Sequence, residues 1–92
     1  MTPVISRQVV IVNKLGLHAR AAAKFVTLAS EFASDIQVRR GEKCINGKSI
    51  MGVMMLAAAK GVTIEVIAHG ADERLALDKL EELIQQRFGE EE

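Results

Sequence analysis

The chain has 92 residues, and its 12 basic and 12 acidic side chains cancel at neutral pH. This length fits one small domain over residues 1–92, and 49% apolar residues suffice for a buried core. The balanced charge gives no argument for nucleic-acid binding, which favours a basic excess on one surface. Residues 1–7 lack the layout of a signal peptide, and no apolar run approaches the roughly 18 residues of a membrane span. We therefore expect a cytoplasmic protein with no membrane insertion.

The apolar pattern predicts seven elements in the order β-α-β-β-α-β-α. Strands are predicted from β-branched or alternating sequence at residues 7–12, 35–40, 43–45 and 62–68. Helices are predicted from apolar residues at helical spacing at residues 19–33, 50–59 and 72–88. Ser49 is expected to cap the second helix, with Lys60 and Gly61 ending it. The one-sided alternation of the strands predicts an α+β open-faced sandwich, a four-stranded antiparallel sheet covered on one face by three helices.

Residues 16–20, with the sequence GLHAR, lie where the first predicted strand gives way to the first predicted helix. The first backbone N–H groups of a helix lack partners, and with the helix dipole they form an anion site. A neutral imidazole nitrogen of His18 can act as a nucleophile, and Arg20 carries donors suited to phosphate oxygens. We expect Ala19 and Arg20 to hold a phosphoryl group carried by His18. The alternative is an ordinary exposed histidine in a turn.

Other residues that could carry chemistry give weaker signals. The Gly-Lys-Ser triplet at 47–49 looks like the end of a P-loop, but Glu42 stands where that loop needs a glycine, which excludes nucleotide hydrolysis. His69 is expected to be solvated, and no second ligand stands at metal spacing beside His18. Cys44 is expected to be a buried, inert thiol, and the acidic residues 90–92 a solvated tail. We predict no metal and no cofactor.

The second predicted helix is rich in methionine, with Ile50, Met51 and Met54 at its start. Such methionines serve as core filler, or they form an exposed patch that docks onto several partners. The sequence leaves both interpretations open. A phosphate on Ser49 would lie at the start of this helix and add negative charge to the surface.

Two segments of the chain resemble a known family. Residues 15–22 (LGLHARAA) resemble the active-site segment of HPr, the histidine-containing phosphocarrier of the bacterial sugar phosphotransferase system. Residues 48–56 (KSIMGVMML) resemble the second signature of that family, around its regulatory serine. The separation of the two segments fits as well, and the similarity extends from about residue 7 to residue 88.

The resemblance implies the HPr fold and a stoichiometric carrier rather than a self-sufficient enzyme. His18 would accept a phosphoryl group at Nδ1 from enzyme I and donate it to an enzyme IIA protein or domain, with Arg20 steadying it. Ser49 would match the serine that HPr kinase/phosphorylase modifies in some bacteria. The docking surface for these partners would comprise Leu17, Ile50, Met51 and Met54. A monomer is the simplest expectation.

The chain also departs from the family pattern. Ala21 stands where the family usually has proline, so we expect the fold to survive with a less rigid start to the helix. Thr27 and Ser30 replace lysines that surround the site in some members, which favours weaker or more hydrophobic partner binding. Residues 13–16 resemble NPr, the nitrogen-branch paralogue, whereas residues 48–56 look more like HPr.

Three alternative functions therefore stand beside the sugar-branch carrier. The first is the NPr role with a different enzyme I. The second is a regulatory binding module that acts through phosphorylated Ser49. The third is an α+β interaction domain with no phosphoryl transfer.

Overall fold

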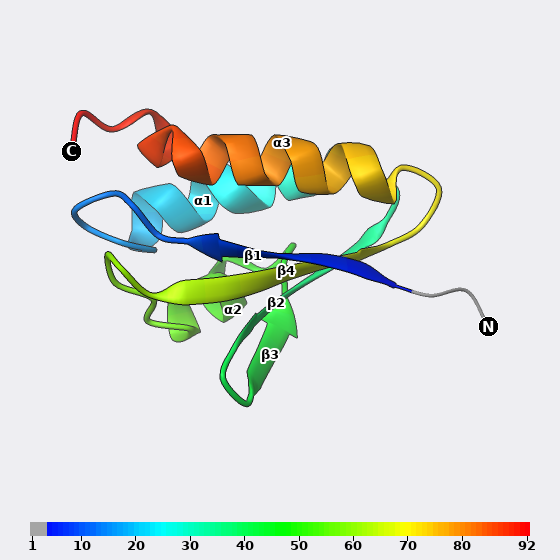
Figure 1. Cartoon of the computed structure of the whole chain (residues 1–92), viewed down its shortest axis with the longest axis horizontal. Coiled ribbons are helices and arrows are strands. Elements are labelled where there is room, and N and C mark those ends of the chain that lie inside the picture. The colour runs from blue at the N-terminus through cyan, green and yellow to red at the C-terminus, as the bar shows by residue number, and fades with distance from the viewer. Residues whose placement is uncertain (1–3) are drawn as a thin grey trace.

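In the computed structural model, residues 4–92 are described, and they form one four-stranded antiparallel sheet with three helices (Figure 1). The strands are β1 (Ile5–Val10), β2 (Asp35–Arg40), β3 (Lys43–Asn46) and β4 (Thr63–His69). The helices are α1 (Ala19–Ala29), α2 (Ile50–Met55) and α3 (Glu73–Gln85), followed by a 3₁₀ turn, η1 (Arg87–Gly89). This architecture confirms the predicted fold. The prediction for the first three residues lies outside the described part of the chain.

The sheet has the strand order β1-β4-β2-β3, so the central strand β4 pairs with β1 and β2, which are both distant in sequence, whereas β2 also pairs with β3, the next strand along the chain. Val9 lies opposite Ile64, and Val38 lies opposite Val66. The alternation of side chains turns these four residues to the same face, where the helices bury them. Figure 1 shows α1 and α3 side by side along the sheet, and α2 packs against α1 and the β3 edge.

The predicted helices are too long at their C-terminal ends, because tertiary contacts end them early. After α1, the Asp72 carboxylate accepts hydrogen bonds from the N–H groups of Ala33 and Ser34 at 2.9 and 3.0 Å, which fixes a non-helical turn. After α2, Ala57 has a left-handed φ of 50°, and Gly61 donates its N–H to Ile11 O at 2.7 Å. Gly61 therefore belongs to the loop before β4 and does not cap α2, contrary to the prediction.

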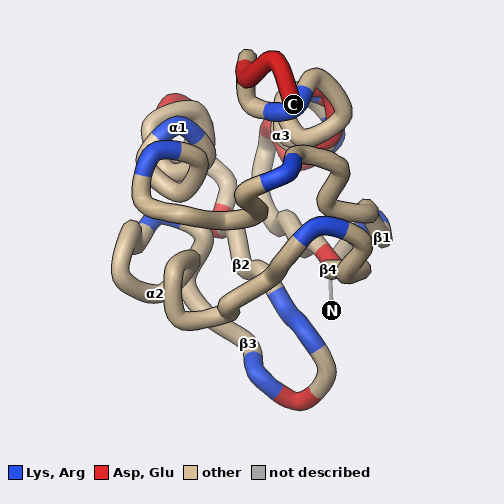
Figure 2. The backbone as a smooth tube through the Cα atoms, turned by 90° about the vertical axis from the view of Figure 1, so that its left-hand side faces the viewer, with Lys and Arg blue, Asp and Glu red and all other residues tan. Residues whose placement is uncertain are grey.

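The end of α3 differs from the prediction in the same way. Arg87 and Phe88 both have left-handed φ values, 58° and 55°, so the chain turns sharply after Gln86. The turn buries the Phe88 ring completely in the core. It also places residues 90–92 near the start of α1, where they line the same surface hollow as His18 and Ala19; in Figure 2 these glutamates are the red stretch that ends at C.

No helix within residues 4–92 has the length and apolar character needed to cross a membrane.

Candidate phosphoryl-transfer site

The loop between β1 and α1 is pressed against the segment after α2. Gly16 has a φ of 67°, and a Cβ at this position would lie 2.5 Å from the carbonyl oxygen of Ala58. Leu17 donates its N–H to the same oxygen at 2.9 Å. Only glycine accommodates both the left-handed backbone and the close approach. The loop thus has a fixed path that leads directly into α1.

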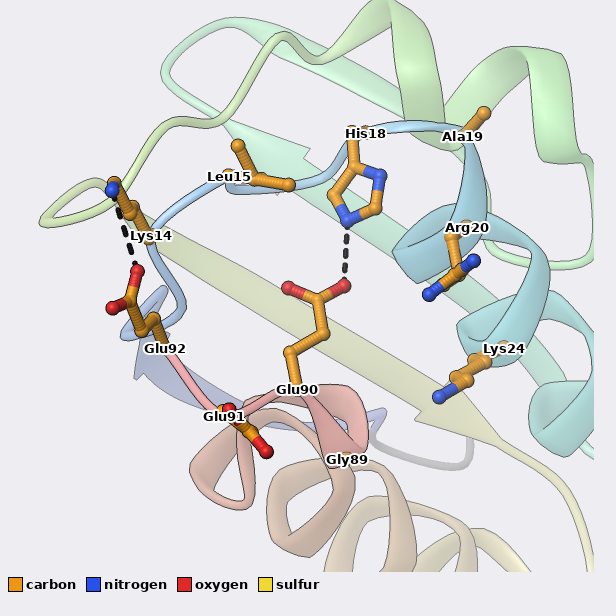
Figure 3. Close-up of a pocket in the computed structure, with 10 residues that line it drawn as sticks. All are labelled: Lys14, Leu15, His18, Ala19, Arg20, Lys24, Gly89, Glu90, Glu91 and Glu92. Atoms are coloured by element: carbon orange, nitrogen blue, oxygen red, sulfur yellow. Dashed lines mark hydrogen bonds and ion pairs between the residues drawn. The ribbon is translucent and has the colours of Figure 1, made fainter.

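Leu17 itself is only 5% exposed, since it packs into the core beneath this loop. The expectation that Leu17 belongs to the docking surface is therefore wrong, because a buried side chain is not available to a partner. Leu15, two residues earlier, is 66% exposed beside His18, and the sequence analysis missed it (Figure 3). The exposed and buried leucines of this loop could not be told apart without the turn at Gly16.

His18 is the N-cap residue of α1, with an extended backbone. Its carbonyl oxygen accepts the first helical hydrogen bond, from Ala22 N at 2.8 Å, while its side chain makes no capping hydrogen bond. The first turn of α1 contains no acidic residue. The first N–H groups of α1, beginning at Ala19, therefore lie at a helix end that neither the N-cap side chain nor an acid of that turn neutralises.

The imidazole ring of His18 is 29% exposed and bordered by an open hollow on the surface. Its Nε2 lies 2.6 Å from Oε2 of Glu90, and its Nδ1 faces the start of α1 (Figure 3). Arg20, also exposed, extends from the first turn of α1 into the same hollow. The arrangement offers an incoming anion a ring nitrogen, helix N–H groups and a guanidinium.

Glu90 is held in place rather than solvated, so the prediction of a solvated tail is wrong for this residue. Its side chain is 15% exposed, and Oε1 accepts a hydrogen bond from Nδ2 of the buried Asn13 at 3.0 Å. Burial would raise the pKa of Glu90, but hydrogen bonds from His18 and Asn13 and the charges of His18 and Lys24 outweigh it. The pKa of Glu90 therefore lies below its ordinary value, and the carboxyl group is ionised at neutral pH.

Further contacts tie residues 88–92 to the site. Lys24 Nζ donates to the carbonyl oxygen of Phe88 at 2.6 Å, and Lys14 Nζ pairs with Glu92 Oε2 at 3.3 Å. The N–H of Lys14 also donates to the main-chain oxygen of Glu92. The only sequence signal for this arrangement was the aromatic residue and glycine at 88–89, which indicate a buried ring and a turn.

The second predicted site lies at the start of α2. Ser49 Oγ accepts a hydrogen bond from Gly52 N at 3.1 Å, which confirms the predicted cap. Ile50, Met51 and Met54 are 43%, 69% and 38% exposed, so the exposed interpretation of these residues is correct. Since α2 packs against α1, the apolar patch of Ile50, Met51 and Met54 lies on the helix that neighbours the His18 helix.

The remaining candidates carry no comparable arrangement. His69 is exposed at the end of β4, as expected. Cys44 is exposed as well, which contradicts the predicted buried thiol. It pairs with Arg39 across β2 and β3, and therefore points to the sheet face that the helices leave open. Within residues 4–92, no group of three or more histidine, cysteine or acidic residues could hold a metal ion.

Residues 5–86 match the family model for the PTS HPr component phosphorylation site. The chain belongs to the HPr family. It is 52% identical over 88 residues to the phosphocarrier protein HPr of Neisseria meningitidis serogroup A, covering 96% of this chain and 99% of that protein. It is also 45% identical over 86 residues to the phosphocarrier protein NPr of Shewanella violacea, covering 94% of each chain.

The fold agrees with a solved member of the HPr family. The crystal structure of HPr-C-His from Thermoanaerobacter tengcongensis superposes with a TM-score of 0.92 at 45% sequence identity, covering 96% of this chain and 99% of that one. The chain is therefore an HPr-type phosphocarrier of the phosphotransferase system, and its relatives include both HPr and NPr proteins.

Proposed function

We propose that His18 accepts a phosphoryl group at Nδ1 from the phosphohistidine of enzyme I and passes it to a histidine of an enzyme IIA protein or domain. The observation that carries the proposal is the placement of His18 as the N-cap of α1, with Nδ1 facing the helix start (Figure 3). Ala19 contributes its N–H and Arg20 its guanidinium to the phosphoryl oxygens. The chain acts as one domain and as a monomer in this exchange.

The open site suits a carrier, which must release the phosphoryl group as readily as it accepts it. Phosphoryl transfer depends on positioning and on stabilising charge at the transferring group. Here one exposed arginine and the helix N–H groups supply only part of that stabilisation. The partner protein supplies the rest when it docks on the exposed patch of Ile50, Met51 and Met54.

To test this proposal, the protein is incubated with phosphoenolpyruvate, magnesium and enzyme I, and its intact mass is then measured. We expect one added phosphate that is labile in acid and stable in alkali, as phosphohistidine is. His18→Ala should abolish the label, whereas His69→Ala, which removes the other histidine, should leave it unchanged. A label that persists in His18→Ala contradicts the proposal.

Comparing sugar-branch with nitrogen-branch enzyme I as the donor decides between the HPr and NPr roles.

Regulation through Ser49 is a second proposal. Its hydroxyl group lies next to the apolar patch, so a phosphate there would place negative charge where partners dock and weaken their binding. Incubation with ATP and HPr kinase/phosphorylase should add a phosphate that is stable in acid and absent from Ser49→Ala. If Ser49→Ala still takes up this acid-stable phosphate, Ser49 is not the site.

A further inference from the structure

The site contains a chain of hydrogen bonds that links Asn13, Glu90 and His18. Asn13 is fully buried, and its Nδ2 donates to both Gly16 O at 2.8 Å and Glu90 Oε1 at 3.0 Å. The other carboxylate oxygen of Glu90 lies 2.6 Å from Nε2 of His18. An ionised carboxylate only accepts hydrogen bonds, so Nε2 carries the hydrogen. In the neutral ring, Nδ1 then keeps its lone pair.

We propose that Glu90 is a positioning residue for phosphoryl transfer through His18. It holds the ring in the Nε2–H form, and it balances the positive charge that the ring gains when Nδ1 binds phosphorus. This inference rests on the proposed function of His18. It assigns a role to a residue outside both segments that resemble the HPr family.

The chemical step shows where the charge arises. The lone pair of Nδ1 forms the new N–P bond, while the bond between phosphorus and the imidazole nitrogen of the donor breaks and its electron pair leaves with the donor. Nε2 keeps its hydrogen, so the His18 ring becomes a cation. The carboxylate of Glu90, 2.6 Å away, stabilises that cation directly. The same arrangement, a carboxylate behind a histidine that reacts through its other nitrogen, orients the imidazole in catalytic triads.

The position of Glu90 also keeps its charge away from the phosphoryl group. Glu90 contacts the edge of the ring at Nε2, whereas Nδ1 and Arg20 lie on the side of α1 (Figure 3). Lys24 and Lys14 hold the flanking residues, Lys24 at the carbonyl oxygen of Phe88 and Lys14 at Glu92. The carboxylate therefore contacts the ring at Nε2 and leaves the start of α1 open to the phosphoryl group.

The test compares Glu90→Gln and Glu90→Ala with Glu91→Gln, a matched control. Glu91 is an exposed neighbour whose main-chain oxygen accepts from Arg87 at 2.7 Å. The first measurement is the ¹⁵N NMR spectrum of the neutral histidine rings, with the exposed His69 as internal reference. We expect His18 to be almost wholly in the Nε2–H form in the natural protein and in Glu91→Gln. In Glu90→Ala the proportion of that form should fall toward the value at His69.

The second measurement is the rate of phosphorylation, with enzyme I and with phosphoramidate, a small donor that needs no docking. Glu90→Ala should slow both reactions on the order of tenfold, since it removes a charge-assisted hydrogen bond to the reacting ring. Glu90→Gln should be intermediate, because its amide oxygen still accepts from Nε2–H but carries no charge. Glu91→Gln should match the natural protein.

The outcomes separate this inference from the proposed function. If the natural protein takes no phosphoryl group on His18, the proposed function fails and the role of Glu90 falls with it. If the natural protein is labelled but both Glu90 variants match it in rate and in the His18 spectrum, only the positioning role is overturned. An equal loss of rate in Glu91→Gln and Glu90→Ala also overturns it, because the loss would then come from the fold of residues 88–92.

Discussion

Helices α1 and α3 both begin near a histidine, and each has an arginine as its second residue, Arg20 in α1 and Arg74 in α3. They differ in their acidic residues. The first turn of α1 contains none, whereas α3 has Asp72 at its N-cap and Glu73 as its first residue. The Glu73 carboxylate accepts the N–H of Gly70 at 3.1 Å, so an internal anion already lies at this helix start.

The comparison shows that a histidine, an arginine and a helix start do not suffice for an anion site. At the start of α3, the carboxylates of Asp72 and Glu73 offset the positive end of the helix dipole. Asp72 also holds the turn after α1 through its hydrogen bonds to the N–H groups of Ala33 and Ser34. The start of α1 lacks an internal acid, and the acid that approaches it, Glu90, binds the far edge of the imidazole ring. The helix that keeps its positive end free is the one that suits an incoming phosphoryl group.

The largest expected effect comes from reversing the charge of the second residue of each helix. Arg20→Glu places a carboxylate at the open start of α1, where it repels the phosphoryl group and competes for the N–H groups. We expect phosphorylation by enzyme I to slow on the order of a hundredfold, comparable to removing a principal donor from an oxyanion site. Arg74→Glu, the matched change in α3, should leave the rate unaltered. Equal losses in the two variants would show that the two helix starts do not differ in function.

The next largest effect concerns the loop between β1 and α1, which positions His18 at the start of α1. Gly16→Ala combines a left-handed φ with a Cβ 2.5 Å from Ala58 O, so the loop must shift. We expect a loss of about 2–3 kcal/mol in the free energy of unfolding. Gly41→Ala is the control, since Gly41 has a similar φ of 60° but open space around the added Cβ, and should cost about 1 kcal/mol. Urea unfolding measures both, and equal costs would contradict the packing argument.

The sequence was sufficient to predict the order of the strands and helices and the position of His18, because alternation and helical spacing are local properties, although β1 begins and ends two residues before the predicted 7–12. It could not predict where the helices end. Asp72 fixes the turn after α1 from 38 and 39 residues away, and the left-handed turn at Arg87 and Phe88 depends on burying the Phe88 ring. Long-range contacts of this kind leave no periodic pattern in the sequence.

The same reason explains which site residues were missed. The sequence predicts Glu90 to be part of a solvated acidic tail, because three consecutive glutamates have no apolar spacing. Only the folded chain brings Glu90 beside Asn13, 77 residues away in sequence. The prediction that Cys44 is buried is wrong because β3 is a short edge strand with only one neighbouring strand. Its four residues are too few to show which face of the strand is buried.

The smallest expected effect tests the structural role of the acids at α3. Hydrogen bonds from the Ser34 hydroxyl and the N–H of Ala33 and Ser34 outweigh desolvation and hold the pKa of Asp72 below its usual value. A lowered pKa in the folded state means that Asp72 stabilises the protein above its unfolded pKa of about 3.9, and that this stabilisation is lost as the pH falls through the folded value. Asp72→Asn should therefore lower the melting temperature at pH 7.

That difference in melting temperature should shrink as the pH is lowered below about 4, because the natural Asp72 then becomes protonated as well. Asparagine keeps one acceptor oxygen but replaces the other with an amide donor, so it cannot accept all three hydrogen bonds that Asp72 accepts. Phosphorylation of His18 should proceed at the natural rate in Asp72→Asn at pH 7. A slower rate in a folded variant would mean that the start of α3 contributes to the transfer site, and the distinction between the two helix starts would no longer hold.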